Sequence, residues 1–289
     1  MLICTRHWEA DRNNDMEPKL IDINDFEYSG EGFCGKSYFH RTDLTKMVKV
    51  YNKGVPVEEV ASELDYSRKV YATGIPCPAP GDLITDGEGR YGILFERLQN
   101  KVSFSRATSL HPEKVEEYAR RFAGMCLKLH STKVDKTQFP SIVERDLQML
   151  EDNPYFTEDE KRRTRDFLLS VPQSDTAVHG DLQYSNALMT DTGDYFIDLG
   201  AFAYGHPYFD LGQVMLSCCI SPDDFIREVF HLEPSQSRDF FKYFVKGYFG
   251  DTADVDEVSK RLEPFVGLMS LLIEKTSKRR EENFHRYLP

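Results

Sequence analysis

Three side chains that could supply oxygen donors lie close together in the second half of the sequence. Residues 179–186 read HGDLQYSN, which contains Asp181 and Asn186, and Asp198 follows within YFIDLG. Mg²⁺ takes oxygen ligands and keeps several waters, so an Asp carboxylate and an Asn carbonyl suit it when phosphate oxygens complete the shell. A second carboxylate can orient an attacking hydroxyl group. The pattern therefore predicts magnesium-assisted chemistry on a phosphate.

A glycine-rich stretch earlier in the chain fits two phosphate-binding patterns. Residues 30–37 read GEGFCGKS, so Gly30, Gly32 and Gly35 form GxGxxG and the same run satisfies the Walker A pattern. Glycine allows backbone N–H groups to approach phosphate oxygens, although an ordinary hairpin turn has the same composition. Walker A and Rossmann loops must each open a helix, whereas the residues that follow, up to Tyr51, are β-type. We therefore expect a hairpin of the kind that covers ATP in protein kinases.

That interpretation makes Lys36 a loop residue and requires another lysine on a later strand. Lys49, within VKV, occupies such a position. A phosphate-binding lysine needs an acidic partner on the next helix, and Glu58, Glu59 and Glu63 are the candidates. Glu58 and Glu59 lie in the first helical turn, where acidic residues are favoured in any case. Glu63 lies at the edge of the inward helical face, so we favour it over a solvent-exposed role for that residue.

The elements expected around these residues change character along the chain. The first part alternates strands and turns around one helix, which Gly54 and Pro56 open and Gly74 and Pro76 close. We expect strands at 24–29, 36–40, 46–51 and 91–95, a loop at 75–90 and an irregular hinge at 96–108. The later part of the chain is mostly helical. We expect helices to start near Pro112, at a capping box formed by Thr157 and Glu160, after Pro207 and at 221–224. A hairpin turn is expected at 191–193. The fold class is therefore α+β, with a small β-rich N-lobe and a larger α-helical C-lobe. We expect a flexible tail at 1–17, the N-lobe at 18–97 and the C-lobe at 98–289.

Composition excludes several classes of partner. The 289 residues include 36 Lys and Arg against 48 Asp and Glu, a net charge of −12. Such a chain is a poor binder of nucleic acid or anionic membranes. No apolar run is long enough to span a membrane, and the six cysteines contain no Cys-x-x-Cys pair, which favours reduced thiols in the cytoplasm. Acidity mildly favours a cationic partner, although solubility alone explains it. Nothing in the sequence indicates the oligomeric state.

The motif at 179–186, together with IDLG at 197–200, is similar to the aminoglycoside phosphotransferase and choline kinase superfamily, whose fold resembles that of protein kinases. The resemblance spans about residues 20–250 and includes Glu63 to Pro76 and the strand YGILFE at 91–96.

Matching positions imply a role for each candidate residue. Asp181 would be the catalytic aspartate, Asn186 and Asp198 would hold Mg²⁺, and Lys49 would bind the α- and β-phosphates of the nucleotide. Backbone groups from Glu96 to Leu98 would meet the adenine ring. Asp210, within YFDLG, matches an aspartate that follows the metal strand, and we expect a structural role for it.

The implied activity is transfer of the γ-phosphoryl group of ATP, or alternatively of GTP, to a hydroxyl of a small molecule. The acceptor could be an aminoglycoside, choline or ethanolamine, an amino-acid hydroxyl or a sugar. A protein kinase is a rival, but no activation segment ending in Ala-Pro-Glu follows Asp198. A non-catalytic nucleotide-binding regulator is a second rival. The presence of all four candidate residues argues against it; they are Lys49, Asp181, Asn186 and Asp198. A P-loop NTPase is the third, and it requires a helix after Ser37.

Overall fold

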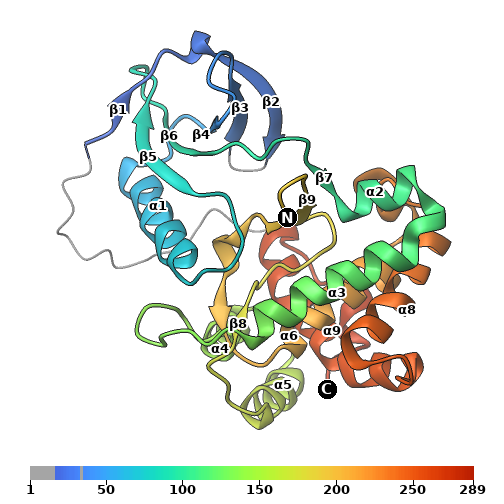
Figure 1. Ribbon diagram of the computed structural model, residues 1–289. Coiled ribbons are helices and arrows are strands. Elements are labelled where there is room, and N and C mark those ends of the chain that lie inside the picture. The colour runs from blue at the N-terminus through green and yellow to red at the C-terminus, as the bar shows by residue number, and fades with distance from the viewer. Residues whose placement is uncertain (1–16, 33–34) are drawn as a thin grey trace. The chain divides into compact units, whose positions relative to one another are not determined.

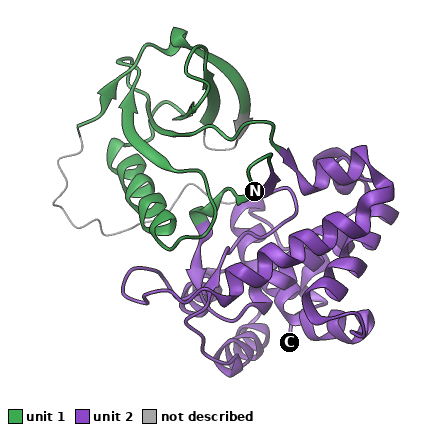
Figure 2. Ribbon diagram, in the orientation of Figure 1, with its two compact units in different colours: residues 1–101, 190–200 green, residues 102–189, 201–289 purple. Residues whose placement is uncertain are grey.

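The computed structural model describes residues 17–32 and 35–289, which divide into two compact units (Figures 1 and 2). The first comprises residues 1–101 and 190–200, and the second comprises 102–189 and 201–289. Residues 190–200 thus belong with the N-terminal unit, although the division predicted from the sequence places them in the C-lobe. Most of the predicted tail and the hairpin tip at 33–34 lie outside the described residues.

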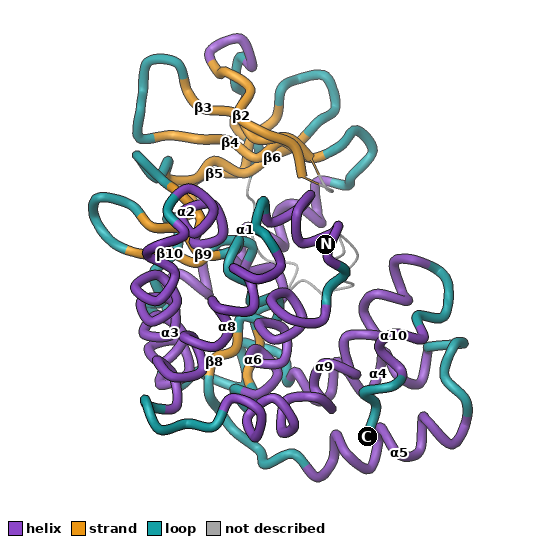
Figure 3. Tube along the Cα trace, turned by 90° about the vertical axis from the view of Figure 1, so that its right-hand side faces the viewer, coloured by secondary structure: helices purple, strands orange, loops and turns teal. Residues whose placement is uncertain are grey.

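The first unit is built on a six-stranded sheet in the order β1-β5-β6-β4-β3-β2, and the strands are drawn in orange in Figure 3. The pairs are antiparallel except for β1 with β5. The strands are β1 (Lys19–Leu20), β2 (Phe26–Gly32), β3 (Gly35–His40), β4 (Lys46–Tyr51), β5 (Pro80–Thr85) and β6 (Tyr91–Glu96), with a 3₁₀ turn at Ile23–Asp25, the helix α1 (Val57–Ala72) and the short strand β10 (Asp194–Phe196).

Alternation along the strands gives the sheet two apolar faces. One face carries Tyr51, Leu83 and Ile93, which pack against Val60 and Leu64 of α1. The other carries a separate cluster of Phe26, Val48, Val50 and Ile84. Because side chains alternate between faces, Lys49 shares the face of Tyr51 and lies on the α1 side of the sheet.

Two details of the sequence prediction for this unit are wrong. Residues 75–90 were expected to form a loop, but β5 occupies Pro80–Thr85 and buries Leu83 and Ile84 between β1 and β6. Pro80 is the first residue of the strand, a position where its missing N–H is tolerated. The strand expected at 24–29 begins later, at Phe26, because Asp22 caps the 3₁₀ turn that precedes it by accepting a hydrogen bond from the Asn24 N–H.

The second unit is mainly helical. Its α-helices are α2 (Phe104–Leu110), α3 (Val115–Ser131), α4 (Ile142–Asp152), α5 (Glu158–Ser170), α6 (Tyr208–Met215), α7 (Asp223–Phe225), α8 (Pro234–Phe249), α9 (Val255–Ser277) and α10 (Glu282–His285). Its strands are β7 (Val102–Ser103), β8 (Ala177–Val178), β9 (Ala187–Met189) and β11 (Ala203–Tyr204), with β7 paired to β9 and β8 to β11. A 3₁₀ turn covers Pro112–Lys114, another covers Leu199–Ala201 at the border of the two units, and π-helical turns cover Leu216–Ile220 and Ile226–Phe230.

Helix starts follow local capping chemistry, including one that the sequence analysis missed. Thr157 and Glu160 form the predicted capping box at the start of α5. The prediction of an irregular hinge at 96–108 is wrong for the second half of that range, where α2 begins. Ser103 is the N-cap of this helix, and its hydroxyl accepts a hydrogen bond from the Arg106 N–H. Phe104, the first residue of that helix, is fully buried and packs against Phe122 of α3 with ring centroids 5.4 Å apart.

The α+β class predicted from the sequence is confirmed: a β-rich unit with one long helix accompanies a larger helical unit. Among the residues that the structure describes, no helix combines the length and apolar character needed to cross a bilayer.

Candidate active site

The glycine-rich segment forms the β2–β3 hairpin, in which Gly30 pairs with Ser37 and Gly32 with Gly35. Because β3 runs from Gly35 to His40, a strand and not a helix follows Ser37, which excludes the Walker A and Rossmann interpretations. A Cβ atom on Gly35 would lie 2.1 Å from the Val50 carbonyl oxygen, whereas one on Gly30 would have no neighbour within 4 Å. Gly35 is therefore required by the close approach of β3 to β4, and Gly30 is under no such packing constraint.

Lys49 and Glu63 form the ion pair that the sequence favoured. The Lys49 Nζ lies 2.8 Å from Glu63 Oε1, and the two side chains are 29% and 30% exposed. Lys49 comes from the middle of β4 and Glu63 from the second turn of α1. The alternatives, Glu58 and Glu59, are exposed in the first turn of that helix.

Tyr51, which the sequence analysis did not single out, lies beside this pair. The Lys49 Nζ is 4.9 Å from the centroid of the Tyr51 ring. Burial raises the pKa of the Tyr51 phenol well above its usual value, and the negative charges of Glu63 and Asp198 raise it further. The sequence could have indicated Tyr51, because side chains alternate along a strand and residue 51 must share the face of residue 49.

The segment expected to meet the nucleotide base follows β6. The Glu96 N–H donates to the Ala79 carbonyl over 2.9 Å, and the Arg97 N–H donates to the Thr45 carbonyl over 2.7 Å. Leu98 is buried. Within the described part of the chain no hydrogen bond is formed by the Leu98 N–H, so this backbone donor is available to an acceptor atom of a ligand.

Asp198 belongs to the same unit as these residues and has an unusual backbone conformation. Its φ angle is +57°, in the left-handed region that Asp tolerates better than most residues. Such conformations cluster at functional sites, where the surrounding structure holds them in place. The Phe196 N–H donates to the Pro76 carbonyl over 2.8 Å, which ties this segment to the loop that follows α1. Among described residues, no hydrogen bond or ion pair involves the Asp198 carboxylate.

The second unit contains the loop with Asp181 and Asn186. The Asn186 Nδ2 donates to the Asp181 carbonyl over 3.0 Å and to Asp181 Oδ2 over 3.3 Å. The Asn186 N–H donates to the Gln183 carbonyl over 2.9 Å, which closes the loop locally. Because the amide nitrogen faces Asp181, the Asn186 carbonyl oxygen is directed elsewhere.

A buried carboxylate anchors this loop. Asp210, which is fully buried, accepts hydrogen bonds from the His179 N–H over 2.7 Å and from the Gly180 N–H over 2.9 Å. The His130 Nε2 lies 3.0 Å from Asp210 Oδ2, and the His130 Nδ1 lies 2.8 Å from the Tyr248 hydroxyl. The loop that carries Asp181 is therefore held by a chain of hydrogen bonds that involves residues of α3, α6 and α8.

Gln213 and Gly180 complete the support of the loop. The Gln213 side chain accepts from the Leu182 N–H and donates to the Gly180 carbonyl. Gly180 has φ +76°, and a Cβ atom there would lie 2.0 Å from the Ala201 carbonyl oxygen. Only glycine fits this position, for both conformational and steric reasons.

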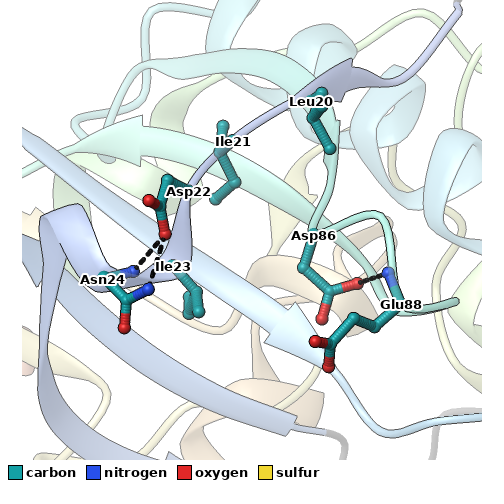
Figure 4. A pocket seen from close by; sticks show the side chains of 7 residues that line it. All are labelled: Leu20, Ile21, Asp22, Ile23, Asn24, Asp86 and Glu88. Atoms are coloured by element: carbon teal, nitrogen blue, oxygen red, sulfur yellow. Dashed lines mark hydrogen bonds between the residues drawn. The ribbon is translucent and has the colours of Figure 1, made fainter.

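A hollow of about 400 Å³ opens elsewhere in the first unit, lined by residues 20–24 with Asp86 and Glu88 (Figure 4). None of the candidate residues lines it. Two of the three carboxylates that line it have local partners, since Asp22 accepts from Asn24 and Asp86 accepts from the Glu88 N–H. We assign no role to this hollow.

The chain resembles several known proteins. Over 88 residues it is 34% identical to a probable bifunctional tRNA threonylcarbamoyladenosine biosynthesis protein of Methanosphaera stadtmanae, a match that covers 29% of this chain. The matched part spans only 15% of that relative.

Among solved structures, the aminoglycoside phosphotransferase APH(4)-Ia with AMP-PNP and hygromycin B gives a TM-score of 0.62 at 14% identity, covering 91% of this chain and 92% of that one.

Two further structures agree in fold. ADP-bound aminoglycoside phosphotransferase APH(2'')-Ib gives a TM-score of 0.58 at 16% identity, covering 92% and 93% of the two chains. A choline/ethanolamine kinase family protein from Mesorhizobium loti gives 0.55 at 16% identity, covering 91% and 83%. At these identities the likeness shows the fold alone.

A sequence profile described as phosphotransferase enzyme family (APH) matches residues 31–242, most of the chain, and this protein therefore belongs to that family of phosphotransferases.

Proposed function

We propose that this protein transfers the γ-phosphoryl group of ATP, with Mg²⁺, to a hydroxyl group of a small molecule. The observation that carries the proposal is the loop at 179–186, in which Asp181 is hydrogen-bonded to Asn186 and the backbone is anchored on the buried Asp210. Such rigid placement suits phosphoryl transfer, because positioning and charge stabilisation supply most of the catalysis.

Residues of the first unit would bind the nucleotide. Lys49, held by Glu63, would neutralise charge on the α- and β-phosphates. The backbone of the hairpin at Gly30, Gly32 and Gly35 would cover the phosphates. The segment from Glu96 to Leu98 would meet the base, with the Leu98 N–H donating to a ring acceptor of adenine. GTP is the alternative nucleotide.

The proposed metal ligands, Asn186 and Asp198, fit a magnesium ion chemically. Both offer oxygen donors, as Mg²⁺ prefers. The Asn186 amide nitrogen is occupied by Asp181, which leaves its carbonyl oxygen as the available atom. The Asp198 carboxylate forms no hydrogen bond and no ion pair within 4.0 Å among described residues, although its charge acts on Lys101 at longer range. When bound, Mg²⁺ would neutralise the charge that develops on the phosphate oxygens.

The role of Asp181 follows from the balance of the reaction. The acceptor oxygen forms a bond to the γ-phosphorus while the bond to the β–γ bridging oxygen breaks, and ADP leaves. Asp181 would orient the acceptor hydroxyl and finally accept its proton. The hydrogen bond from Asn186 keeps the Asp181 carboxylate in place during this step.

The acceptor would be a small molecule, and the net charge of −12 favours one that is cationic. The solved relatives bind hygromycin B or belong to a choline/ethanolamine kinase family, which defines a first panel of compounds. We propose a cytoplasmic location, because the six cysteines contain no Cys-x-x-Cys pair and favour reduced thiols. We propose neither a nucleic-acid nor a membrane partner, in keeping with the acidic composition.

Phosphoryl transfer from Mg-ATP and Mg-GTP across that panel would test the proposal. The panel should contain aminoglycosides, choline, ethanolamine, amino alcohols, sugars and a generic protein substrate. We expect transfer to one small-molecule class, and a rate loss on the order of 10²- to 10⁴-fold in Asp181→Asn. Asp152→Asn, at the exposed end of α4, is the matched control and should keep full activity.

Three other outcomes would contradict the proposal in different ways. Transfer only to the protein substrate would identify a protein kinase. Nucleotide binding without transfer to any compound, together with no ATP hydrolysis, would identify a regulator. Full turnover in Asp181→Asn would show that the role of this aspartate is wrong.

A further inference from the structure

The Lys49 ammonium group has two close neighbours. The Glu63 carboxylate lies 2.8 Å from Nζ. The ring of Tyr51 is the second neighbour, with its centroid 4.9 Å from the same atom. This distance falls within the range in which a cation is attracted to the negative face of an aromatic ring.

The two contacts differ in how firmly they are fixed. Each side chain of the ion pair is about a third exposed, and exposed ion pairs hold long, flexible side chains only weakly. The Tyr51 ring is 2% exposed and packs within the cluster that includes Val60 and Leu64 of α1. Because its neighbours already fix the ring, the ring itself loses no further conformational entropy when Lys49 rests against it.

The Tyr51 hydroxyl has no well-formed hydrogen bond. It is buried and makes no hydrogen bond of ordinary geometry with the residues that the structure describes, although the nearby Glu63 carboxylate contributes, through a side-chain contact, to the raised pKa of the phenol. The pKa of the phenol is raised by burial, so the ring is neutral at physiological pH. A neutral ring acts on Lys49 through its face, as a phenylalanine at this position would.

We infer that Tyr51 is a positioning residue for the phosphate-binding Lys49, and that its ring, not its hydroxyl, performs this role. The inference rests on the proposed function, in which Lys49 binds the α- and β-phosphates. The ring restricts the ammonium group to the region beside Glu63 before the nucleotide arrives. Loss of the ring would then weaken nucleotide binding equally in the ground state and the transition state, which raises KM and leaves kcat unchanged.

Substitution at residue 51 separates the ring from the hydroxyl. We expect Tyr51→Phe to match the wild type, and Tyr51→Leu to raise KM for Mg-ATP roughly 3- to 10-fold with kcat within about twofold. Tyr91→Leu is the matched control, because Tyr91 packs partly buried against the same cluster and has no cation over its ring among described residues. It should change stability without changing KM.

A second series keeps the volume of the ring and changes only its electron density. Replacing Tyr51 with phenylalanine, 4-fluorophenylalanine and 3,5-difluorophenylalanine withdraws charge from the ring face stepwise. We expect the dissociation constant of Mg-ATP, measured by calorimetry, to rise with each fluorine, and the trend to persist in Glu63→Gln. This series tests whether the ring face of residue 51 affects Mg-ATP binding, even if Tyr51→Leu fails to fold.

The outcomes are distinct. A loss in Tyr51→Phe equal to that in Tyr51→Leu would assign the role to the hydroxyl and overturn the inference. So would affinities that do not change along the fluorinated series. Wild-type protein that binds neither Mg-ATP nor Mg-GTP would instead overturn the proposed function itself, and the two failures are thereby distinguishable.

Discussion

Replacing Asp210 with asparagine should disable the enzyme from a position where it touches no substrate. The carboxylate accepts from the His179 and Gly180 N–H groups and faces His130 Nε2. An asparagine keeps one oxygen, so its amide nitrogen must face at least one of these donors. A lost charge-assisted hydrogen bond costs about 1.5–3 kcal/mol, and a buried N–H without a partner adds about 1–3 kcal/mol.

The sum is roughly 2.5–6 kcal/mol, a large fraction of the stability of about 5–15 kcal/mol that a native protein has. Some of this loss would be avoided by movement of the loop, which would displace Asp181. A displacement of about 1 Å is enough to lower kcat on the order of 10²-fold. We therefore expect both a less stable second unit and a lower kcat, with the KM for Mg-ATP nearly unchanged.

Urea unfolding and steady-state kinetics on the same samples would measure both effects. Asp146→Asn is the matched control, because Asp146 is also buried in the second unit but accepts its hydrogen bond from Arg145 Nε, over 3.2 Å. It should keep a kcat close to that of the wild type, because Asp146 accepts its hydrogen bond from Arg145 and not from the loop at 179–186. If Asp210→Asn keeps the wild-type kcat at temperatures where it is folded, the anchoring argument is refuted.

Three further predictions concern other contacts. Gly180→Ala should lower stability by more than about 2 kcal/mol and abolish measurable turnover, because the new Cβ would meet the Ala201 carbonyl; circular dichroism melts and activity assays would show whether the site tolerates it. Glu63→Gln should raise KM for Mg-ATP up to about fivefold while Glu58→Gln does not, and equal KM values in the two variants would remove the assigned partner of Lys49. The hydrogen bonds from Arg280 hold the pKa of Glu160 well below its usual range, so the stability from this pair is full above about pH 4.3 and is lost as the pH falls below that value. Unfolding free energies at pH 7 and pH 3.5 should differ less in Glu160→Gln than in the wild type, and an unchanged difference would contradict this.

Much of the fold was predictable because its signals are local. The helix at Val57–Ala72, the strands that contain Lys49 and residues 91–96, and the capping box at Thr157 all follow from short-range periodicity or capping. The strand at Pro80–Thr85 was not predictable in this way, because its place between β1 and β6 depends on partners distant in sequence. The start of α2 was missed although Ser103, a favoured N-cap residue, signals it.

The candidate site shows the same division between local and distant information. Asp181 and Asn186 lie five residues apart within one motif, and the structure joins them by a hydrogen bond. The pairing of Lys49 with Glu63 followed from helix spacing. Tyr51 was missed because an aromatic residue at the end of an apolar strand has the same pattern as any core residue. The hydrogen bonds of Asp210 to the loop could not be derived from spacing, because they depend on how α6 packs.

The unequal surroundings of the glycines in the β2–β3 hairpin determine how this motif would respond to selection. Gly35 has no room for a Cβ beside β4, so its replacement would be eliminated even in a screen that scores only folded protein. Gly30 has open space around it, so substitutions there would survive such a screen and disappear only when survival depends on turnover. A comparison of the two screens over one mutant library would therefore separate the glycine that the sheet requires from the glycine that the chemistry requires.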